Sequence, residues 1–484
     1  MQRRKRLFGS LCGLALAAGF SLAGTALATT AMAQSGEIKI GEINSYSLLP
    51  AFTEPYRKGW QLAVEEVNAA GGINGKKLVV VSKDDSGKPA DAQTAANELV
   101  SNENVVMLTG TFLSNIGLAV SDFAKQKKVF FLAAEPLTDA ITWSKGNRYT
   151  FRLRPSNYMQ AAMLVEEAAK LPAKRWATIA PNYEYGQSAV AVFKKLLSEK
   201  RPDIQWVDEQ WPPQGKIDAG PIVQALANSN PEAILNVTFG ADLVKFVREG
   251  NTRGLFKDRA VVSFLTGEPE YLDPLKEETP SGWIVTGYPW YSIKTPEHDA
   301  FLKAYQGKFN DYPRLGSIVG YQTIKAAAAI LIKANSTDPE KMIVAAEGLS
   351  MPSPFGQITF RKIDHQSTLG AFVGKTALKD GKGVMVDSVY RNGGGFPAER
   401  CGSREVTSER LSLATAGARC ARGIHQPWIA YELLLCSISD RSCERGIAVS
   451  GCLGSVDYLR RHADCEFCAW RILHAGRLRR IHAD

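Results

Sequence analysis

Apolar residues at helical spacing, followed by a run of valines, form the clearest local pattern in the chain. Four of them recur on one face of a helix: Trp60, Ala63, Val64 and Val67. Gly71 then permits the left-handed conformation that ends many helices, and the valines at 79–81 are typical of a buried strand. Residues 38–43 form another strand candidate upstream. The segment therefore predicts a β-α-β unit of a parallel sheet, a pattern that fits any Rossmann-like domain.

The same alternation continues through most of the chain. The first series has predicted helices at 88–101 and 114–126 and predicted strands at 105–109 and 129–133. The second has predicted helices at 158–170, 186–197, 220–228 and 241–249 and predicted strands at 176–180, 204–209, 233–237 and 260–264. A strand at 283–287 and helices at 298–309 and 318–334 follow. We therefore predict an α/β protein with two lobes, in which the chain returns to the first lobe before a short C-terminal pass through the second.

The first 33 residues have the composition of a cleavable export signal. Four basic residues at 3–6 precede an apolar body, and Ala31-Met32-Ala33 is a small-residue cleavage site. Abundant Gly, Ala and Thr dilute the apolar body, which favours a signal over a membrane helix. We expect export with a cut after Ala33. We find no other window long and apolar enough to span a bilayer, so we expect a soluble mature protein.

Charge and cysteine are unevenly distributed along the chain. The formal net charge of +9 comes from +4 in residues 1–33, +2 in residues 34–392 and +3 in residues 393–484. The nearly neutral body has no basic stripe with interleaved aromatic residues, so we expect no nucleic-acid partner. The body also lacks cysteine, and its roughly 360 residues are enough for two ordinary cores without disulfides.

Residues 393–484 differ in composition from the body. They contain no Lys, 13 Arg, seven of the eight Cys and four of the six His. A frameshift or read-through at the end of the gene produces such a change, and we expect this segment to be disordered. The alternative is a metal site made by His462, Cys465, Cys468 and His474. Structural zinc sites usually pair two Cys-x-x-Cys knuckles or a well-spaced His pair, so we predict neither a metal nor a cofactor.

Enzymatic chemistry finds little support in the body. His298 and His365 are its only histidines, and neither a Gly-x-Ser-x-Gly elbow nor a phosphate loop ending in Gly-Lys-Ser/Thr is present. No Gly-x-Gly-x-x-Gly turn for a dinucleotide follows the first strand. The Asp84-Asp85 pair would serve as acid and base or as a metal clamp, but solvated or turn-capping carboxylates are the favoured interpretation. We predict that the chain is not an enzyme.

Several phrases of the body occur in the order found in one known family. They are 68–75 (NAAGGING), Asp84-Asp85, Phe151-Arg152, 183–186 (YEYG) and 248–250 (REG). With them the chain resembles, over 37–392, the periplasmic solute-binding proteins of ABC-type branched-chain amino acid importers, the leucine/isoleucine/valine-binding type. The resemblance implies a type I periplasmic binding protein with two Rossmann-like lobes, joined by a three-crossover hinge, that close on a ligand.

The resemblance also implies a division of the chain and a function. Lobe 1 would comprise 34–154 and 288–355, and lobe 2 would comprise 155–287, with 356–392 forming its C-terminal pass and part of the hinge. The protein would capture a branched-chain or related aliphatic or aromatic amino acid, or a similar small carboxylate. It would deliver this ligand to inner-membrane permease and ATPase subunits. We expect a periplasmic monomer. The alternatives are a periplasmic sensing subunit with a signalling partner and an exported α/β enzyme.

Two predicted strand-to-helix loops are candidates for holding a carboxylate. Such loops lie at the carboxyl ends of strands, where helix N-termini offer free N–H groups. Ser114, followed by Asn115, either caps its helix or binds an anion through its hydroxyl and the adjacent amides. The resemblance assigns an amino acid's carboxylate to this loop and to the loop at 134–138. In the loop at 134–138, Leu137 occupies the position where the family has Thr. Thr138 follows it directly, and Glu135 lies two residues before it.

The resemblance assigns the remaining parts of a ligand to an acid and to aromatic residues. Glu268 matches the acid that binds the ammonium group, and a carboxylate in a closing cleft attracts a cation more strongly than one at the surface. Tyr185 matches a cleft Tyr of the family. Phe52 and Phe239 stand where Tyr is expected, so two hydroxyls are lost. We therefore expect a more apolar pocket that favours a larger aliphatic or aromatic side chain, or an acid other than leucine.

Overall fold

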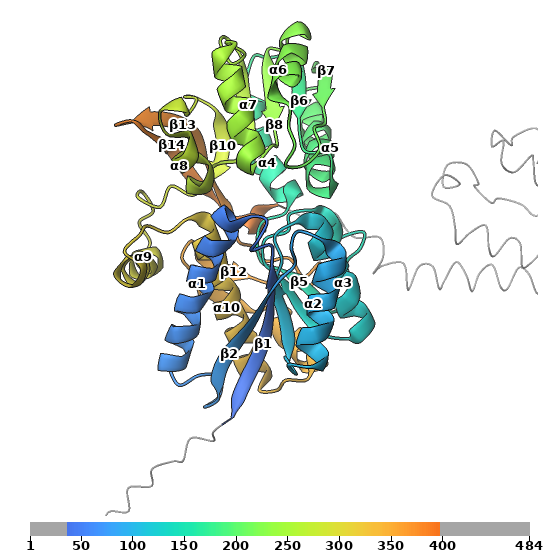
Figure 1. The fold of residues 1–484 in the computed structure, drawn as a ribbon, viewed down its shortest axis with the longest axis vertical. Helices are drawn as coiled ribbons and strands as arrows, with labels where there is room; N and C mark the ends of the chain where they lie inside the picture. Colours follow the sequence, from blue (N-terminus) through green and yellow to red (C-terminus); the bar gives the residue numbers. More distant parts are fainter. Residues whose placement is uncertain (1–35, 397–484) are drawn as a thin grey trace, which may run out of the picture. The chain divides into compact units, whose positions relative to one another are not determined.

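The computed structural model describes residues 36–396, and the first of its two large sheets comes from the N-terminal part of this range (Figure 1). Its five strands are parallel in the order β2-β1-β3-β4-β5. The elements are β1 (Glu37–Asn44), α1 (Pro50–Ala69), β2 (Lys77–Asp84), α2 (Pro89–Ser101), β3 (Met107–Gly110), α3 (Ser114–Lys127), β4 (Phe130–Ala133), the 3₁₀ turn η1 (Asp139–Ile141) and β5 (Thr150–Arg152). Helices on both faces explain why every residue of β3 and β4 is buried.

The order of these strands positions a ligand site. The helix after β1 packs into one apolar core, and those after β2 and β3 pack into another. Adjacent strands β1 and β3 therefore send their connections to opposite faces of the sheet. Ligands of open α/β sheets bind at such a switch point, outside the carboxyl ends of the strands. The predicted Ser114 loop follows β3 at this point.

Two 20-residue helices, α1 and α10 (Leu315–Ala334), meet backbone to backbone on one face of this sheet. A Cβ atom at Gly59 would lie 2.0 Å from the Ser317 carbonyl oxygen, and one at Gly320 would lie 2.1 Å from the Tyr56 carbonyl oxygen. By length and composition α10 can cross a membrane, which corrects the expectation that no window outside the signal passes that test. Within the described fold, 72% of its apolar window is buried, as in the core helix of a soluble protein.

The second sheet has seven strands in the order β14-β13-β10-β9-β8-β6-β7. Its strands are β6 (Arg175–Ile179), β7 (Gln205–Gln210), β8 (Ala233–Asn236), β9 (Ala260–Gly267), β10 (Ile284–Gly287), β13 (Ala371–Lys379) and β14 (Lys382–Arg391). The helices are α4 (Asn157–Ala168), α5 (Glu184–Lys200), α6 (Ala219–Asn228), α7 (Gly240–Thr252), α8 (Pro269–Leu275) and the 3₁₀ turn η2 (Lys276–Glu278). Strands β6 to β10 are parallel, whereas β13 and β14 form an antiparallel hairpin beside β10.

The chain passes between the two sheets three times. It crosses after β5 and returns after β10 to form α9 (Pro296–Phe309), α10, α11 (Pro339–Ala346) and the hairpin of β11 (Ser350–Ser353) and β12 (Gly356–Thr359). It crosses again between β12 and β13. We call the first sheet with α1–α3 and α9–α11 lobe 1, and the second sheet with α4–α8 lobe 2. This arrangement confirms the predicted type I fold with its three crossovers.

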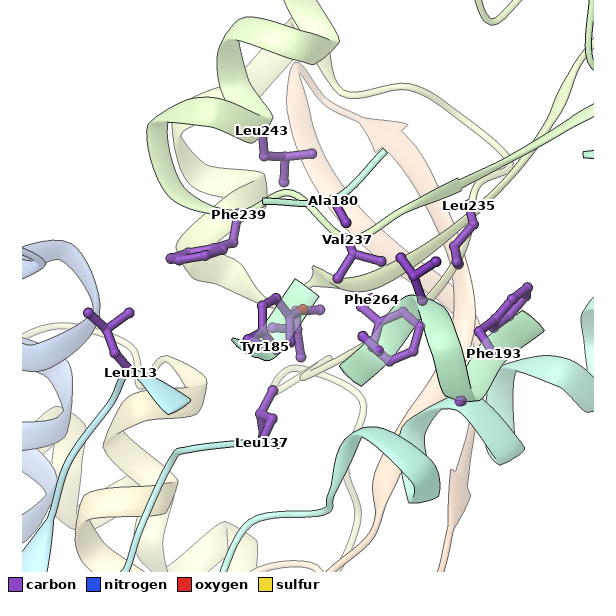
Figure 2. Close-up of a cluster of buried hydrophobic side chains, with 14 of the residues drawn as sticks. Leu113, Leu137, Ala180, Tyr185, Phe193, Leu235, Val237, Phe239, Leu243 and Phe264 are labelled. Atoms are coloured by element: carbon purple, nitrogen blue, oxygen red, sulfur yellow. The ribbon is translucent and has the colours of Figure 1, made fainter. Parts of the chain in front are cut away.

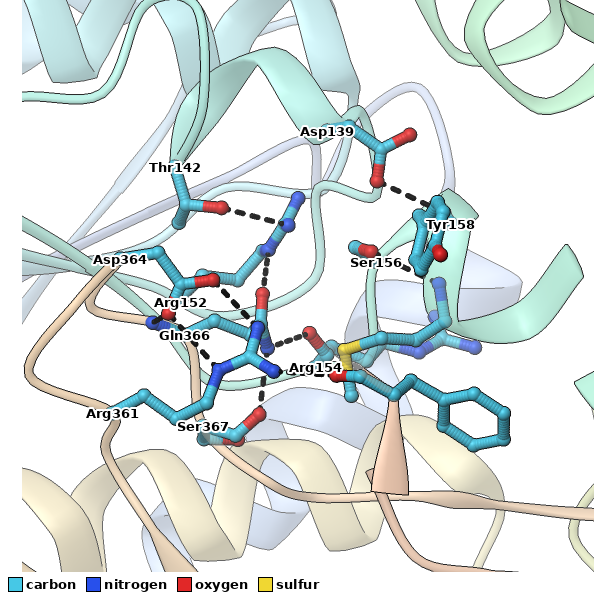
Figure 3. A network of polar contacts seen from close by, with 12 residues as sticks. Asp139, Thr142, Arg152, Arg154, Ser156, Tyr158, Arg361, Asp364, Gln366 and Ser367 are labelled. Atoms are coloured by element: carbon cyan, nitrogen blue, oxygen red, sulfur yellow. Dashed lines mark hydrogen bonds and ion pairs between the residues drawn. The ribbon is translucent and has the colours of Figure 1, made fainter. Parts of the chain in front are cut away.

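Buried polar groups join the first and third crossovers (Figure 3). The Arg152 N–H donates to the His365 carbonyl (3.0 Å), and the Ser367 N–H donates to the Arg152 carbonyl (2.9 Å). Burial lowers the pKa of the Arg152 guanidinium to about 10. This group donates to Gln366 Oε1 (2.5 Å) and to Thr142 Oγ1 (3.1 Å). These bonds hold the end of β5 in place just before the chain enters lobe 2.

Several predictions fall on parts of the chain outside the described residues. The signal with its cut after Ala33 lies there, as do residues 397–484 of the unusual tail with the alternative metal ligands His462, Cys465, Cys468 and His474. Residues 393–396 belong to the described fold. They include the 3₁₀ turn η3 (Gly393–Gly395), and the Gly393 N–H donates to the Thr368 carbonyl (3.0 Å).

Candidate ligand cleft

A cavity lined by residues of both lobes lies at the carboxyl ends of the lobe 1 strands. It contains about 280 Å³ of empty space, part of which is open to solvent. We call it the ligand cavity. Its lining is mostly aromatic and apolar, with an arginine, a carboxyl group and a hydroxyl: Phe112, Ser114, Glu135, Leu137, Arg154, Tyr183, Tyr185, Phe239, Leu265 and Tyr271.

Ser114 connects the two predicted carboxylate loops. It is the first residue of α3, and Leu113 occupies the N-cap position, so the interpretation of Ser114 as an N-cap is wrong. The buried Ser114 Oγ instead accepts hydrogen bonds from the N–H groups of Leu137 (3.3 Å) and Thr138 (3.2 Å). Its own hydroxyl proton remains available to donate. The N-terminus of α3 adds the positive end of a helix dipole, which favours an anion.

The lining of the ligand cavity does not include four of the predicted site residues: Phe52, Asn115, Thr138 and Glu268. The Thr138 hydroxyl donates to Glu184 Oε1 (2.6 Å). Asn115 Oδ1 is buried and has no hydrogen-bond partner within residues 36–396. The Phe52 ring packs 5.3 Å from the ring centroids of both Phe112 and Tyr271, two of the lining residues. Phe52 therefore supports the aromatic wall from outside.

The aromatic wall comes largely from lobe 2. Figure 2 shows Tyr185 and Phe239 on the side that faces Leu113 and Leu137 of lobe 1. The two rings meet edge to face, with centroids 5.9 Å apart. The Tyr185 hydroxyl is buried without a hydrogen-bond partner in the described chain, and burial raises its pKa. The wall thus combines an apolar surface with an available donor.

Glu268, the predicted ammonium ligand, is already paired in this structure. It forms an ion pair with Arg154, and the two side chains are only 4% and 6% exposed. Burial raises the pKa of Glu268 well above its ordinary value, and the Arg154 charge acts against this rise. Burial would lower the pKa of Arg154, but its pairing with Glu268, together with the other nearby acidic residues, outweighs burial and raises it. Arg154 therefore remains a cation.

Among the described residues that line the ligand cavity, Glu135 is the only acid. It is 3% exposed, and its Oε2 has no hydrogen-bond partner among the described residues. Burial raises the pKa of its carboxyl to about 8, with the nearby Arg154 charge acting in the opposite direction. At neutral pH Glu135 is therefore mostly a neutral carboxylic acid that can donate a hydrogen bond.

A second cavity lies beside the first and is bordered by all three crossovers. It has about 370 Å³ of empty space, and Arg154, Gln160, Glu268, Gly287 and Gly370 are among its lining residues. Arg154 is shared with the ligand cavity, whereas Glu268 lines only this second cavity. The Arg154 side chain thus belongs to the wall between the ligand cavity and the predicted ammonium ligand.

The lobes contact each other around the ligand cavity. Glu270 on α8 of lobe 2 accepts from the first N–H groups of α10 in lobe 1, those of Leu315 (3.2 Å) and Gly316 (2.8 Å). The Ser188 hydroxyl of lobe 2 donates to Asp139 Oδ2 of lobe 1 (3.2 Å). Together with the hydrogen bond from Thr138 to Glu184, these bonds connect the two lobes and hold the cleft in a closed arrangement.

Unusual backbone conformations also mark the cleft. Thr111, just before the Ser114 loop, has φ of 63°, and the lining residue Leu265 has φ of 66°. Non-glycine residues rarely adopt these values, and they do so disproportionately at ligand sites. The Leu265 N–H donates to Thr286 Oγ1 (3.0 Å), which holds the irregular end of β9 in place.

The sequence prediction missed half of the lining: Phe112, Arg154, Tyr183, Leu265 and Tyr271. Tyr183 lies inside the quoted phrase 183–186, and Phe112 lies two residues before the predicted site residue Ser114. Arg154 carried one usable signal, because it is a charged residue two positions after β5 and immediately before Pro155. The Asp84-Asp85 pair accepts hydrogen bonds from turn groups, including Ser45 Oγ to Asp85 (2.6 Å) and the Ser86 N–H to Asp84 (3.1 Å). Within the described residues no group of three potential metal ligands was found.

Known proteins share this fold and a part of this sequence. Residues 37–382 match the family of periplasmic binding proteins. The chain is 28% identical over 298 residues to Leu/Ile/Val-binding protein homolog 7 of Brucella suis biovar 1 (strain 1330). The matched region covers 58% of this chain and 73% of the relative.

Solved structures with a similar fold include a solute-binding protein of an ABC transporter from Rhodopseudomonas palustris BisB5, in complex with 3,4-dihydroxybenzoic acid. Its TM-score is 0.67, with 21% identity over 74% of this chain and 99% of the other. The substrate-binding protein LivJ from Streptococcus pneumoniae, in complex with isoleucine, has a TM-score of 0.64 and 23% identity over 74% and 99%. The chain therefore belongs to the periplasmic binding protein family, as the resemblance to solute receptors of ABC importers predicted.

Proposed function

We propose that this protein is the periplasmic receptor of an ABC importer for a small organic acid, either an amino acid or a related carboxylate. The observation that carries the proposal is the convergence of two lobe 1 loops on Ser114 in a cavity closed by aromatic residues of lobe 2. A hydroxyl and helix N-terminal amides bind a carboxylate without the need for a metal.

Ser114 is the proposed anchor of the ligand's carboxylate. Its hydroxyl donates to a carboxylate oxygen, while its lone pairs keep the Leu137 and Thr138 N–H groups in place. A preorganised donor in a dry site is worth more than the same donor in water, because the effective dielectric constant is lower. The aromatic lining then buries the rest of the ligand and selects for an apolar body.

Closure of the cleft is the proposed signal to the membrane partner. A ligand that touches both lobes stabilises the closed arrangement, in which Glu270 caps α10 and Thr138 contacts Glu184. A permease that recognises the closed receptor would then accept only loaded molecules, and its ATPase subunits would supply the energy of transport. The relatives named above are solute-binding proteins, which favours this role over that of a sensing subunit or an exported enzyme.

The ligands of the two structural relatives define the proposed range. One relative was crystallised with an aromatic acid and the other with isoleucine. Both ligands carry a carboxylate on an apolar body, which is the chemistry that Ser114 and the aromatic wall fit.

A thermal-shift screen of the purified protein tests the proposal, with hits confirmed by calorimetry. The panel comprises α-amino acids, their deaminated analogues and benzoates. A ligand at a hundredfold excess over its Kd should add about 2.7 kcal/mol to the free energy of unfolding, which is a shift of a few degrees. Ser114→Ala should weaken the binding of every hit, whereas Ser101→Ala on the exposed end of α2 should not. Silence across the whole panel would refute the proposal.

A further inference from the structure

The site predicted to bind an ammonium group has no free acid in this structure. Glu268 is ion-paired with Arg154, and both side chains are almost completely buried. A Glu that already has a buried guanidinium partner gains little from a second cation. For an ammonium group to displace Arg154, the guanidinium would have to find another partner or lie buried and unpaired, which costs several kcal/mol.

The groups that face the ligand cavity are mainly donors. The Arg154 guanidinium, the Ser114 hydroxyl and the unpartnered Tyr185 hydroxyl all line it. A ligand ammonium brought into this space would lie near the Arg154 cation. Like charges brought together in a desolvated site cost several kcal/mol, and such repulsion is a common basis of specificity.

Glu135 offers no strong replacement for Glu268. It is the only acid in the lining, and its environment of burial and other carboxyl groups favours the neutral form at neutral pH. A neutral carboxyl group lacks the charge that pays for dehydrating an ammonium ion. It donates readily to a carboxylate, so it adds a further donor to the cavity.

We propose that Arg154 is a specificity residue that excludes α-ammonium groups, so the ligand is an apolar monocarboxylate such as a benzoate or a branched aliphatic acid. This inference rests on the proposed function and narrows its ligand class. Arg154 acts in two ways: it holds Glu268 away from the ligand, and its charge attracts the ligand's carboxylate. The aromatic lining of both lobes supplies the complementary surface for the apolar body.

Matched ligand pairs test the inference on the unaltered protein. Leucine and 4-methylpentanoate differ only by the ammonium group, and so do phenylalanine and 3-phenylpropanoate. Benzoate serves as the short aromatic probe. Calorimetry at pH 7 should give a Kd for at least one deaminated acid about 100-fold or more below that of its amino acid partner.

Two variants separate the role of Arg154 from a general effect on folding. Arg154→Gln releases Glu268, so the preference should shift by about tenfold or more toward the amino acid of each pair. The double variant Arg154→Gln with Glu268→Gln removes both charges; it should lose affinity for the deaminated acid and gain none for the amino acid. Arg253→Gln, at the exposed C-cap position of α7, should leave both affinities unchanged.

The outcomes distinguish this inference from the proposed function. If an amino acid binds as tightly as its deaminated analogue or more tightly, the inference is wrong and the receptor function stands. If Glu268→Gln abolishes amino acid binding, the ammonium assignment is restored and the inference is likewise wrong. If no carboxylate of either kind binds, both proposals fail. The comparison on the unaltered protein decides between these outcomes even where a variant does not fold.

Discussion

Glu42 predicts an unusual dependence of stability on pH. It lies on β1 and is fully buried, and its Oε2 accepts hydrogen bonds from the Tyr46 hydroxyl (2.9 Å) and Ser82 Oγ (2.6 Å). Its Oε1 has no hydrogen-bond partner in the described part of the chain. Burial raises the pKa of Glu42 from the ordinary 4.5 to about 8, against the hydrogen bonds from these two hydroxyls. The folded protein therefore keeps a proton that the unfolded chain releases.

The sign and size of the effect follow from this difference in proton binding. Because folded Glu42 binds more protons between pH 4.5 and 8, its contribution to the free energy of unfolding is greatest below about pH 4.5 and falls as the pH rises toward 8. At about 1.4 kcal/mol per pH unit, Glu42 alone accounts for a loss of about 3 kcal/mol between pH 5 and pH 8. Glu42→Gln removes this proton exchange but keeps the shape of the side chain.

Urea unfolding followed by tryptophan fluorescence, at four pH values between 5 and 8, measures the effect. For Glu42→Gln the difference in unfolding free energy between pH 5 and pH 8 should be about 3 kcal/mol smaller than for the unaltered protein. Glu199→Gln, on the exposed end of α5, is the matched control and should leave the difference unchanged. If Glu42→Gln shows the same pH dependence as the unaltered protein, Glu42 does not retain its proton and the reasoning is refuted.

Three further predictions concern packing, closure and the aromatic wall. Gly320→Ala should destabilise the protein by about 1–3 kcal/mol in urea unfolding, because its Cβ would lie 2.1 Å from the Tyr56 carbonyl oxygen. As a control, Gly307→Ala on α9, where a Cβ meets open space, should stabilise the protein by up to about 1 kcal/mol. Glu270→Ala removes the cap that lobe 2 places on α10 and should weaken ligand binding about tenfold or more in calorimetry. Because the lobes lose this contact, small-angle scattering should show a larger radius of gyration. Phe239→Ala should reduce the affinity for an aromatic acid about tenfold or more, with the melting temperature of the free protein changed much less than the affinity. Unchanged values in any of these measurements would contradict the corresponding contact.

The fold was predictable where local pattern and burial agree. Helices such as α3 and α7 and strands such as β8 lie within a few residues of the predicted ranges, because apolar period and burial coincide there. The hairpin of β13 and β14 was missed as strands. Its residues are only partly buried and contain several charged side chains, so its pairing depends on β10, which is about 90 residues away along the chain.

Five residues of the candidate cavity were predicted, because the resemblance assigns them to loops that follow strands or to the starts of helices. Ser114, Glu135, Leu137, Tyr185 and Phe239 all line the ligand cavity, and each follows a strand or begins a helix. The ion pair of Arg154 and Glu268 joins residues 114 positions apart. No local pattern specifies which of several nearby acids an arginine meets, because that depends on how the crossovers pack. The resemblance assigned Glu268 to the ligand's ammonium group, whereas this structure places it in the lining of the second cavity and pairs it with Arg154.

Glu135 gives a last prediction, which links the charge of the cleft to the ligand. Its carboxyl lines the ligand cavity, and its pKa of about 8 reflects burial, the opposing charge of Arg154 and the neighbouring acids Glu270 and Glu42. Below pH 7 the neutral group donates to a ligand carboxylate; above pH 8 it becomes an anion that repels it.

The Kd of a carboxylate without an ammonium group should therefore be constant between pH 6 and 7 and rise by up to about tenfold per pH unit above 8. Calorimetry with the tightest deaminated acid measures this profile, and Glu135→Gln should flatten it without abolishing binding at pH 6. An amino acid ligand predicts the opposite slope between pH 7 and 9, because the ionised carboxylate would attract its ammonium group. The direction of the slope thus reports the charge of the group that faces Glu135, independently of the variants at Arg154. Tighter binding at pH 9 than at pH 7 would place a cation beside Glu135 and rule out a purely anionic ligand.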